Sequence, residues 1–179
     1  MRYLLFFILL ISCNSVSPVQ VVNIEDIELS LSNGVVLYKS KIFTGTLVAK
    51  DFDGVLSYTC NYVKGRKVGE EKKWYSNGQL ESHRFYNDGV KVGIHKGWWP
   101  SGLPKFTLEF NTQGAYHGIV KEWFENGTLS KSFHYVNGKE EGGQQLYKPN
   151  GNIRANYVVR DGERYGLIGL KKCDAILVK

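Results

Sequence analysis

Four histidines are the side chains best suited to bind a metal ion or move a proton at neutral pH. They are His83, His95, His117 and His134. Their places relative to the preceding glycines differ, and neither Cys60 nor Cys173 belongs to a Cys-x-x-Cys pair. We therefore expect no metal site and interpret the histidines as turn or solvent-exposed residues. The sequence predicts no cofactor.

Two acidic pairs, Glu70-Glu71 and Glu140-Glu141, are the other groups that invite a catalytic interpretation. Adjacent side chains of a strand point to opposite faces, so such a pair does not form an acid/base couple. The sequence also lacks Gly-x-Ser-x-Gly, His-Glu-x-x-His and the phosphate-binding glycine loop. We expect that the protein is not an enzyme and that both pairs are solvated turn carboxylates.

Cys13 follows a short apolar segment that begins after Arg2. This segment is too short to span a bilayer as a helix and is typical of a signal peptide. The stretch Leu-Ile-Ser-Cys resembles a bacterial lipobox, which implies that Cys13 is acylated and becomes the first mature residue. Asn14 after the cysteine, by the same resemblance, implies an outer-membrane anchor facing the periplasm. The alternative is an ordinary signal peptide that contains a cysteine.

Cys60 and Cys173 remain once Cys13 is acylated, and an even pair in an oxidising compartment suggests a disulfide. The repeats described below place the two cysteines on the order of 40 Å apart at about 4.8 Å per strand, whereas a disulfide needs Cα atoms within about 7 Å. We therefore expect Cys60 to be a buried thiol. Cys173 is left free or paired with another chain.

The composition is that of a folded domain. Of 179 residues, 42% are hydrophobic and 13% aromatic, which excludes a disordered tail and a protein with many membrane spans. The formal net charge of +6 is too small and too dispersed to indicate a nucleic-acid binder.

Glycines recur at a spacing of 24 or 25 residues in three columns, the mark of a repeat protein. The first glycine column holds Gly54, Gly78, Gly102, Gly127 and Gly151. The second glycine column holds Gly65, Gly89, Gly114, Gly138 and Gly162. The third glycine column holds Gly45, Gly69, Gly93, Gly118, Gly142 and Gly166.

Asn-Gly and Asp-Gly pairs occupy most positions of the first two columns, and such pairs favour tight hairpin turns. A turn at each of these glycines gives two strands per repeat. Within the second strand, apolar residues alternate with polar ones, as in Leu56, Tyr58, Cys60 and Tyr62. The sequence therefore predicts a sheet with one apolar and one wet face.

An aromatic pair precedes the first-column turn in three repeats, and we call its members the aromatic ladder. They are Trp74, Tyr75, Trp98, Trp99, Trp123 and Phe124. One interpretation is that these side chains form the core that neighbouring repeats bury against each other. The other is that they line a groove for a ligand or a protein partner, and they are then the candidate partner-binding residues.

Units such as residues 69–80, closed by residues 85–93, resemble the bacterial variant of the MORN repeat. The resemblance covers residues 33–166 and implies an all-β, elongated, single-layer antiparallel sheet of successive hairpins that contacts proteins or lipids. Some bacterial members are antitoxins of toxin-antitoxin pairs. Export by a lipobox does not suit that role, because it removes the chain from cytoplasmic toxins.

The predicted organisation is a signal-peptide helix (residues 1–12), a tether (13–20), an N-terminal cap (21–44), five repeats (45–166) and a C-terminal capping strand (167–179). We expect a lipid-anchored envelope protein that acts as a non-catalytic scaffold or protein-binding module. Basic turn residues favour an alternative, binding to anionic lipid. They are Arg66, Lys67, Lys91, Lys139 and Arg164.

Overall fold

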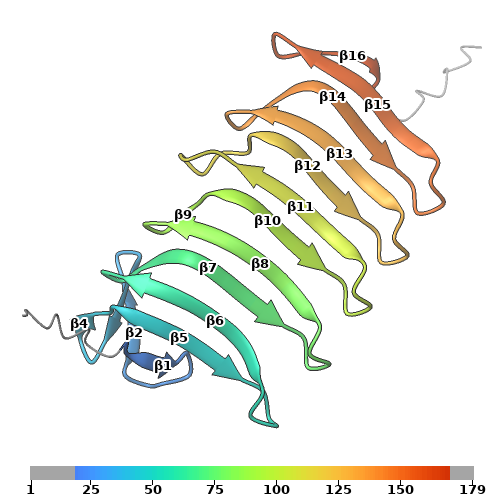
Figure 1. Cartoon of the computed structure of the whole chain (residues 1–179). Helices are drawn as coiled ribbons and strands as arrows, with labels where there is room; N and C mark the ends of the chain where they lie inside the picture. Colours follow the sequence, from blue (N-terminus) through green and yellow to red (C-terminus); the bar gives the residue numbers. More distant parts are fainter. Residues whose placement is uncertain (1–18, 170–179) are drawn as a thin grey trace, which may run out of the picture.

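The computed structural model describes residues 19–169, which fold into a long sheet of hairpins with a small sheet at its N-terminal end (Figure 1). The strands are β1 (Val21–Asn23), β2 (Leu29–Ser32), β3 (Val35–Tyr38), β4 (Lys41–Ile42), β5 (Gly45–Lys50), β6 (Leu56–Val63), β7 (Arg66–Trp74), β8 (Leu80–Asn87), β9 (Val90–Lys91), β10 (Gly93–Trp98), β11 (Pro104–Phe110), β12 (Gly118–Trp123), β13 (Leu129–Val136), β14 (Lys139–Tyr147), β15 (Ile153–Arg160) and β16 (Glu163–Leu167).

The predicted all-β, elongated sheet of successive hairpins is confirmed. From β5 to β16 each strand pairs antiparallel with its neighbours in chain order, and β9 adds a short pairing to β8. One detail of the prediction is wrong, because the sheet is mixed: β1 pairs parallel with β5 at the N-terminal edge. No described segment forms a helix long and apolar enough to cross a membrane. The predicted signal-peptide helix, Cys13 and Cys173 lie outside the described residues.

Both predicted kinds of turn are present, with different geometry. At the second column, the glycine and the residue before it have positive φ in four of the five turns, as at Asn137-Gly138, which is the geometry of the tightest hairpins. At the first column only the glycine has positive φ, as at Gly127. Each hairpin closed by such a turn shifts its strand register just before it, for example between Glu122 and Trp123.

The third glycine column does not form turns. Gly69 and Gly142 have positive φ inside β7 and β14, where the pairing with the preceding strand skips residues. Such bulges bend a strand, and the strands of the long sheet are visibly bent (Figure 1). The interpretation of Glu70-Glu71 and Glu140-Glu141 as turn residues is therefore wrong, since both pairs lie within strands.

One face of the long sheet carries most of its rings, and we call it the aromatic face. A row of directly paired residues, which runs through every strand from β5 to β15 except β9, defines which side chains lie on this face. The row is Ala49, Tyr58, Lys73, Ser82, Gly97, Phe106, Glu122, Lys131, Leu146 and Ala155. The opposite, polar face carries the residues between them, such as Lys72, Lys96 and Thr107, so the predicted two-faced sheet is confirmed.

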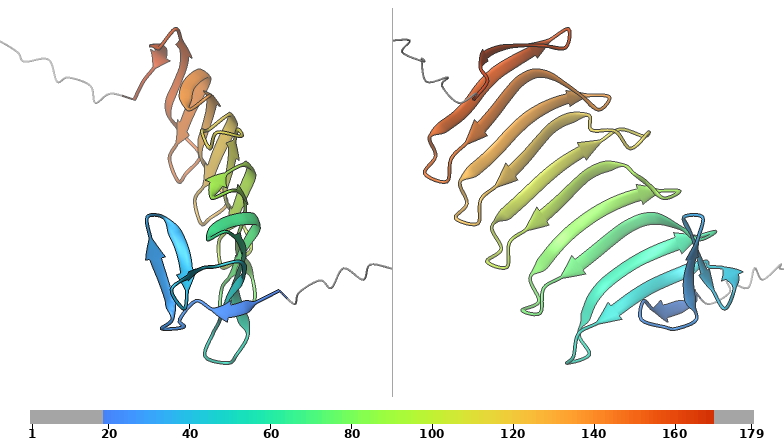
Figure 2. Two further views of the ribbon diagram at one scale, coloured as in Figure 1. Left: turned by 90° about the vertical axis from the view of Figure 1, so that its left-hand side faces the viewer. Right: turned by 180° about the vertical axis from the view of Figure 1, so that it is seen from behind.

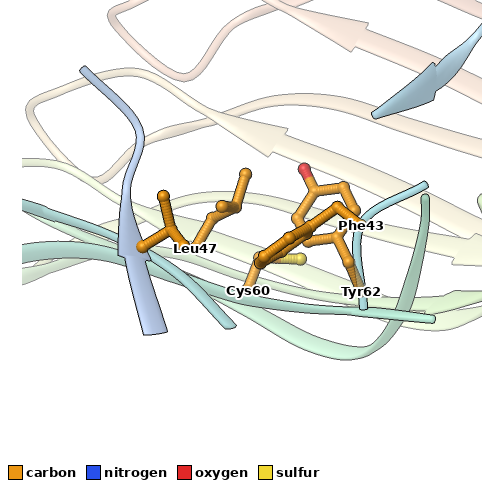
Figure 3. Close-up of a cluster of buried hydrophobic side chains, with 5 residues drawn as sticks. Phe43, Leu47, Cys60 and Tyr62 are labelled. Atoms are coloured by element: carbon orange, nitrogen blue, oxygen red, sulfur yellow. The ribbon is translucent and has the colours of Figure 1, made fainter. Parts of the chain in front are cut away.

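Residues 21–44, expected as a cap, form β1 and a separate three-stranded sheet, β2-β3-β4. Figure 2 shows this small sheet standing beside the N-terminal end of the long sheet. Phe43, 1% exposed, lies between them and packs with Leu47, Cys60 and Tyr62 (Figure 3). Gly65 joins the two sheets through its backbone: its N–H donates to Phe43 O at 2.6 Å, and its carbonyl accepts from Val36 N–H at 2.9 Å.

Cys60 is 1% exposed in this cluster, as the alternation predicted, and burial raises the pKa of its thiol to about 11. A thiol in such a place acts as a small apolar side chain. Its burial removes it from the solution chemistry that a surface cysteine would have.

Candidate functional site

A run of touching rings crosses the aromatic face from β8 to β15. Each ring centroid lies within 6.3 Å of the next one in the run. The members are Tyr86, His95, Phe110, Tyr116, Tyr135, Phe133 and Tyr157. Lateral packing of large rings on bent strands buries several of them without a second layer of structure. The ring run thus forms a continuous strip of neighbouring rings along the aromatic face.

The ring run was missed as a site, although part of its signal is in the sequence. The eighth residue after a first-column glycine is Tyr62, Tyr86, Phe110 or Tyr135 in four repeats. These residues alternate in phase with the apolar face and recur at the repeat spacing. Aligning the repeats on their glycines therefore reveals a second aromatic column, besides the aromatic ladder.

His95 corrects the interpretation of the histidines as turn or exposed residues. It lies in β10, is 1% exposed, and sits between the rings of Tyr86 and Phe110. Burial lowers the pKa of His95, and its Nε2 lies 2.8 Å from Phe85 O. His95 is thus a neutral member of the ring run. Among residues 19–169 no group of three or more metal-ligating side chains comes together.

All six residues of the aromatic ladder are half-buried at the first-column ends of the strands. Two of them connect consecutive repeats. The Tyr75 hydroxyl donates to Trp98 O at 2.9 Å, and Trp99 Nε1 donates to Trp123 O at 3.3 Å. Phe124 occupies the same position one repeat later but has no polar atom for such a bond. Tyr75 and Trp99 therefore have a structural role.

Removing the inter-repeat bond of Tyr75 tests that role. We expect Tyr75→Phe to lower the free energy of unfolding by about 1 kcal/mol, the usual net value of one hydrogen bond. Tyr165→Phe is the matched control, because Tyr165 is 59% exposed and makes no side-chain hydrogen bond within the described residues. Urea unfolding of the three proteins gives the comparison. Equal stability of Tyr75→Phe and the parent would show that the bond contributes nothing.

Three ladder residues, Trp74, Trp99 and Trp123, border two hollows of the aromatic face. The tryptophan hollow, of about 280 Å³, is lined by Trp99, Phe106, Leu108, Tyr116, Glu122 and Trp123 among others. The ladder therefore contributes Trp99 and Trp123 to this hollow. Lys105 Nζ stands 4.4 Å from the centroid of the Trp99 ring at its margin. Trp98 borders neither hollow; it pairs with Pro104 across the hairpin.

The second hollow, of about 620 Å³, lies nearer the small sheet and contains Trp74. We call it the cationic hollow, because its walls also carry Lys67, Lys73 and Arg84 around Glu71. Glu71 is 1% exposed, forms an ion pair with Lys67, and lies 3.5 Å from the guanidinium of Arg84. Partial burial alone would lower the pKa of Lys67, but its hydrogen bond and charge attraction to Glu71, with smaller contributions from Tyr62 and Tyr86, together raise it.

When the repeats are aligned on their glycines, the position of Glu71 explains why its side chain is buried. The residue two places after each of the first five third-column glycines is Leu47, Glu71, His95, Val120 or Gln144, and all five are buried, whereas Ile168 after Gly166 is exposed. A carboxylate in such a column must be paired to be tolerated. Lys67 and Arg84 provide that pairing, so Glu71 holds both cations against the aromatic face.

The repeat unit defined by this geometry is one hairpin, with the first-column glycine at its centre and a register shift beside it. Residues 67–88 and 116–137 match the family model described as MORN repeat variant; they contain β8, β12 and β13 and all of β7 but its first residue. The chain carries MORN repeats. Hairpins β5–β6, β10–β11 and β14–β15 share the same register shift as the two matched hairpins.

Comparisons with other proteins add little to this assignment. No curated protein matches the chain. Two solved structures of S. aureus TarM, one a mutant in complex with fondaparinux, alpha-GlcNAc-glycerol and UDP, align with 64% of this chain and 20% of TarM. The identity is 16% and the TM-score 0.32. The MORN chain thus spans a fifth of the length of TarM, and the likeness is too weak to support an argument.

MORN repeats are in general protein- or membrane-binding modules. The two modes require different surfaces. Of the basic turn residues that favoured lipid, Arg66 pairs with Asp88 at 3.6 Å and Arg164 with Glu140 at 3.0 Å. Lys67 is turned onto the aromatic face toward Glu71. Carboxylates thus pair with three of the five basic turn residues, whereas Lys91 and Lys139 make no ion pair with the described residues, so the positive charge offered to an anionic membrane is reduced but not removed.

Proposed function

We propose that this chain is a lipid-anchored envelope protein that binds another protein through its aromatic face and has no catalytic activity of its own. The observation that carries the proposal is the ring run with its two hollows. Beyond β8, no described element covers this face (Figures 1 and 2). Half-buried aromatic and apolar side chains next to shallow hollows are the usual anchors of protein interfaces.

The anchor rests on the sequence around Cys13. Two or three acyl chains hold a protein stably on a membrane, whereas a single chain does so only marginally. Anchoring on the outer membrane facing the periplasm would present the MORN sheet to other envelope proteins. The scaffold role follows from the shape, since a long sheet offers binding positions over many strands.

Fatty-acid labelling tests the anchor. We expect cells fed an alkyne-tagged fatty acid to label the parent protein, and Cys13→Ser to abolish the label and release the protein from the membrane fraction. Cys173→Ser is the control and should retain the label. If the parent and Cys13→Ser both fractionate with the cytosol, the antitoxin-like alternative, which requires a cytoplasmic protein, is revived.

A pair of neighbouring residues tests the binding face. Leu108 lies in the tryptophan hollow, while Thr107 lies beside it in β11 on the polar face. Cross-linked pull-down from the native envelope should recover a stoichiometric protein partner with the parent and with Thr107→Asp. We expect Leu108→Asp to lose it, because the new carboxylate must be desolvated at the interface. Recovery of the bait alone from all three samples would refute the proposal.

A further inference from the structure

The cationic hollow has an excess of positive charge that the fold does not neutralise. Lys67, Lys73 and Arg84 surround a single carboxylate, Glu71. Lys73 has no carboxylate within salt-bridge distance among the described residues. The neighbouring Lys72, on the polar face, is by contrast paired with Glu70. The excess charge is therefore specific to the aromatic face.

Aromatic rings hold the three cations in place without neutralising them. Lys67 Nζ lies 4.9 Å from the Tyr86 ring centroid, Lys73 Nζ 5.8 Å from that of Tyr58, and Arg84 Cζ 5.8 Å from that of Phe106. A ring attracts a cation but leaves its N–H donors available to an anion. The side chains of Lys67 and Arg84 remain 30% and 33% exposed. Their donors are thus preorganised and accessible from the hollow.

We propose that the cationic hollow receives an acidic side chain of a polypeptide partner, whose apolar residues fill the tryptophan hollow. The proposal rests on the proposed protein-binding function and adds the chemistry of the partner. A carboxylate suits the hollow because Arg84 and Lys73 offer charge-assisted hydrogen bonds, and Trp74 and Tyr58 provide walls for the aliphatic part of an Asp or Glu side chain.

The arrangement along the sheet favours a polypeptide over a lipid surface. The hollows lie on one face, and β7 is separated from β11 and β12 by three or four strand steps, which is about 15 to 20 Å at about 4.8 Å per step. A peptide can place an acidic and an apolar side chain at that distance. An anionic membrane instead requires cations spread over one exposed side, and the turn cations Arg66 and Arg164 are paired with carboxylates.

Peptide selection tests the proposal with the full lipidated chain in non-ionic detergent. A random 16-residue display library is selected on the chain, and the best peptide is synthesised with a fluorescent label. A second peptide replaces its Asp and Glu by Asn and Gln. We expect the selected peptides to combine acidic and aromatic or aliphatic residues, and the amide peptide to bind at least tenfold more weakly. Affinity should also fall as salt rises.

Two double variants with the same change of charge locate the site. Lys73→Gln/Arg84→Gln removes two cations of the hollow, and Lys72→Gln/Lys96→Gln removes two from the polar face. We expect the first to weaken peptide binding at least tenfold and the second less than twofold. If Arg84→Gln harms folding, Lys73→Gln alone serves as the test, because it breaks no ion pair of the described residues. We expect this single variant to weaken peptide binding several-fold.

The outcomes separate this proposal from the function on which it rests. Peptide binding that is lost in Leu108→Asp but unchanged in Lys73→Gln/Arg84→Gln would refute the site for an acidic side chain. It would leave the binding face intact. Selection of neutral or basic peptides would also refute the acidic site. Failure to select any peptide, with binding to phosphatidylglycerol vesicles instead, would refute both.

Discussion

Gly97→Val is expected to destabilise the sheet by about 3 kcal/mol or more, the upper range for overpacking. Gly97 belongs to none of the three glycine columns and has no unusual φ. Glycine is required at position 97 because of a close contact. A Cβ atom there would lie 2.2 Å from the Phe106 ring, which rests directly on the backbone of β10. The valine must push this ring off the aromatic face.

A background without the Phe106 ring tests whether that ring causes the loss of stability. In a Phe106→Ala background, we expect the further cost of Gly97→Val to fall below about 1 kcal/mol, because the clashing ring is gone. Gly143→Val in β14 is the matched control, since a Cβ atom there meets nothing within 4 Å. Urea unfolding measures all variants. An equal cost of Gly97→Val with and without the Phe106 ring would show that the ring does not lie as described.

Phe43→Ala is expected to have the second large effect, a loss of about 3 to 5 kcal/mol, as for other buried phenylalanines. The Phe43 ring touches Tyr38 of the small sheet and Tyr62 of the long sheet, with centroids 6.2 and 6.0 Å away. Its removal therefore takes away the core that joins the two sheets. We expect the small sheet to separate before the MORN hairpins unfold, since repeats depend mainly on their neighbours.

Hydrogen exchange resolves that order. In Phe43→Ala, amides of β2–β4 should lose protection while those of β12–β14 keep theirs. Phe52→Ala is the control, because the Phe52 side chain is fully exposed and its loss should change the free energy of unfolding by less than about 0.5 kcal/mol. Uniform loss of protection along the whole chain in Phe43→Ala would mean that the small sheet and the repeats unfold as one unit.

The repeating part of the fold could be predicted because it is set by local chemistry. A glycine with Asn or Asp before it specifies a hairpin turn, and seven of the ten glycines in the first two columns follow Asn or Asp. The N-terminal part has no such repetition. The parallel pairing of Val21 with Thr46 and the docking of Val36 on Gly65 are tertiary contacts, so no local sequence pattern predicts them.

The candidate site was predicted in part. The aromatic ladder was correctly placed at the first-column turns, and Trp74, Trp99 and Trp123 border hollows of the aromatic face. Glu71 was interpreted as a solvated turn residue, because the pair Glu70-Glu71 follows a third-column glycine. Its burial depends on the bulge at Gly69 and on two cations, Lys67 of the same strand and Arg84 of the neighbouring strand β8.

Site-specific photo-cross-linking in living cells tests most directly whether the aromatic face is the binding surface. A photoreactive phenylalanine analogue is placed at Leu108 in one strain and at Thr107 in another, two adjacent residues on opposite faces of β11. If the aromatic face binds a protein, the analogue at position 108 should capture that protein in a discrete adduct and the analogue at position 107 should not. An adduct formed only from position 107 would contradict it.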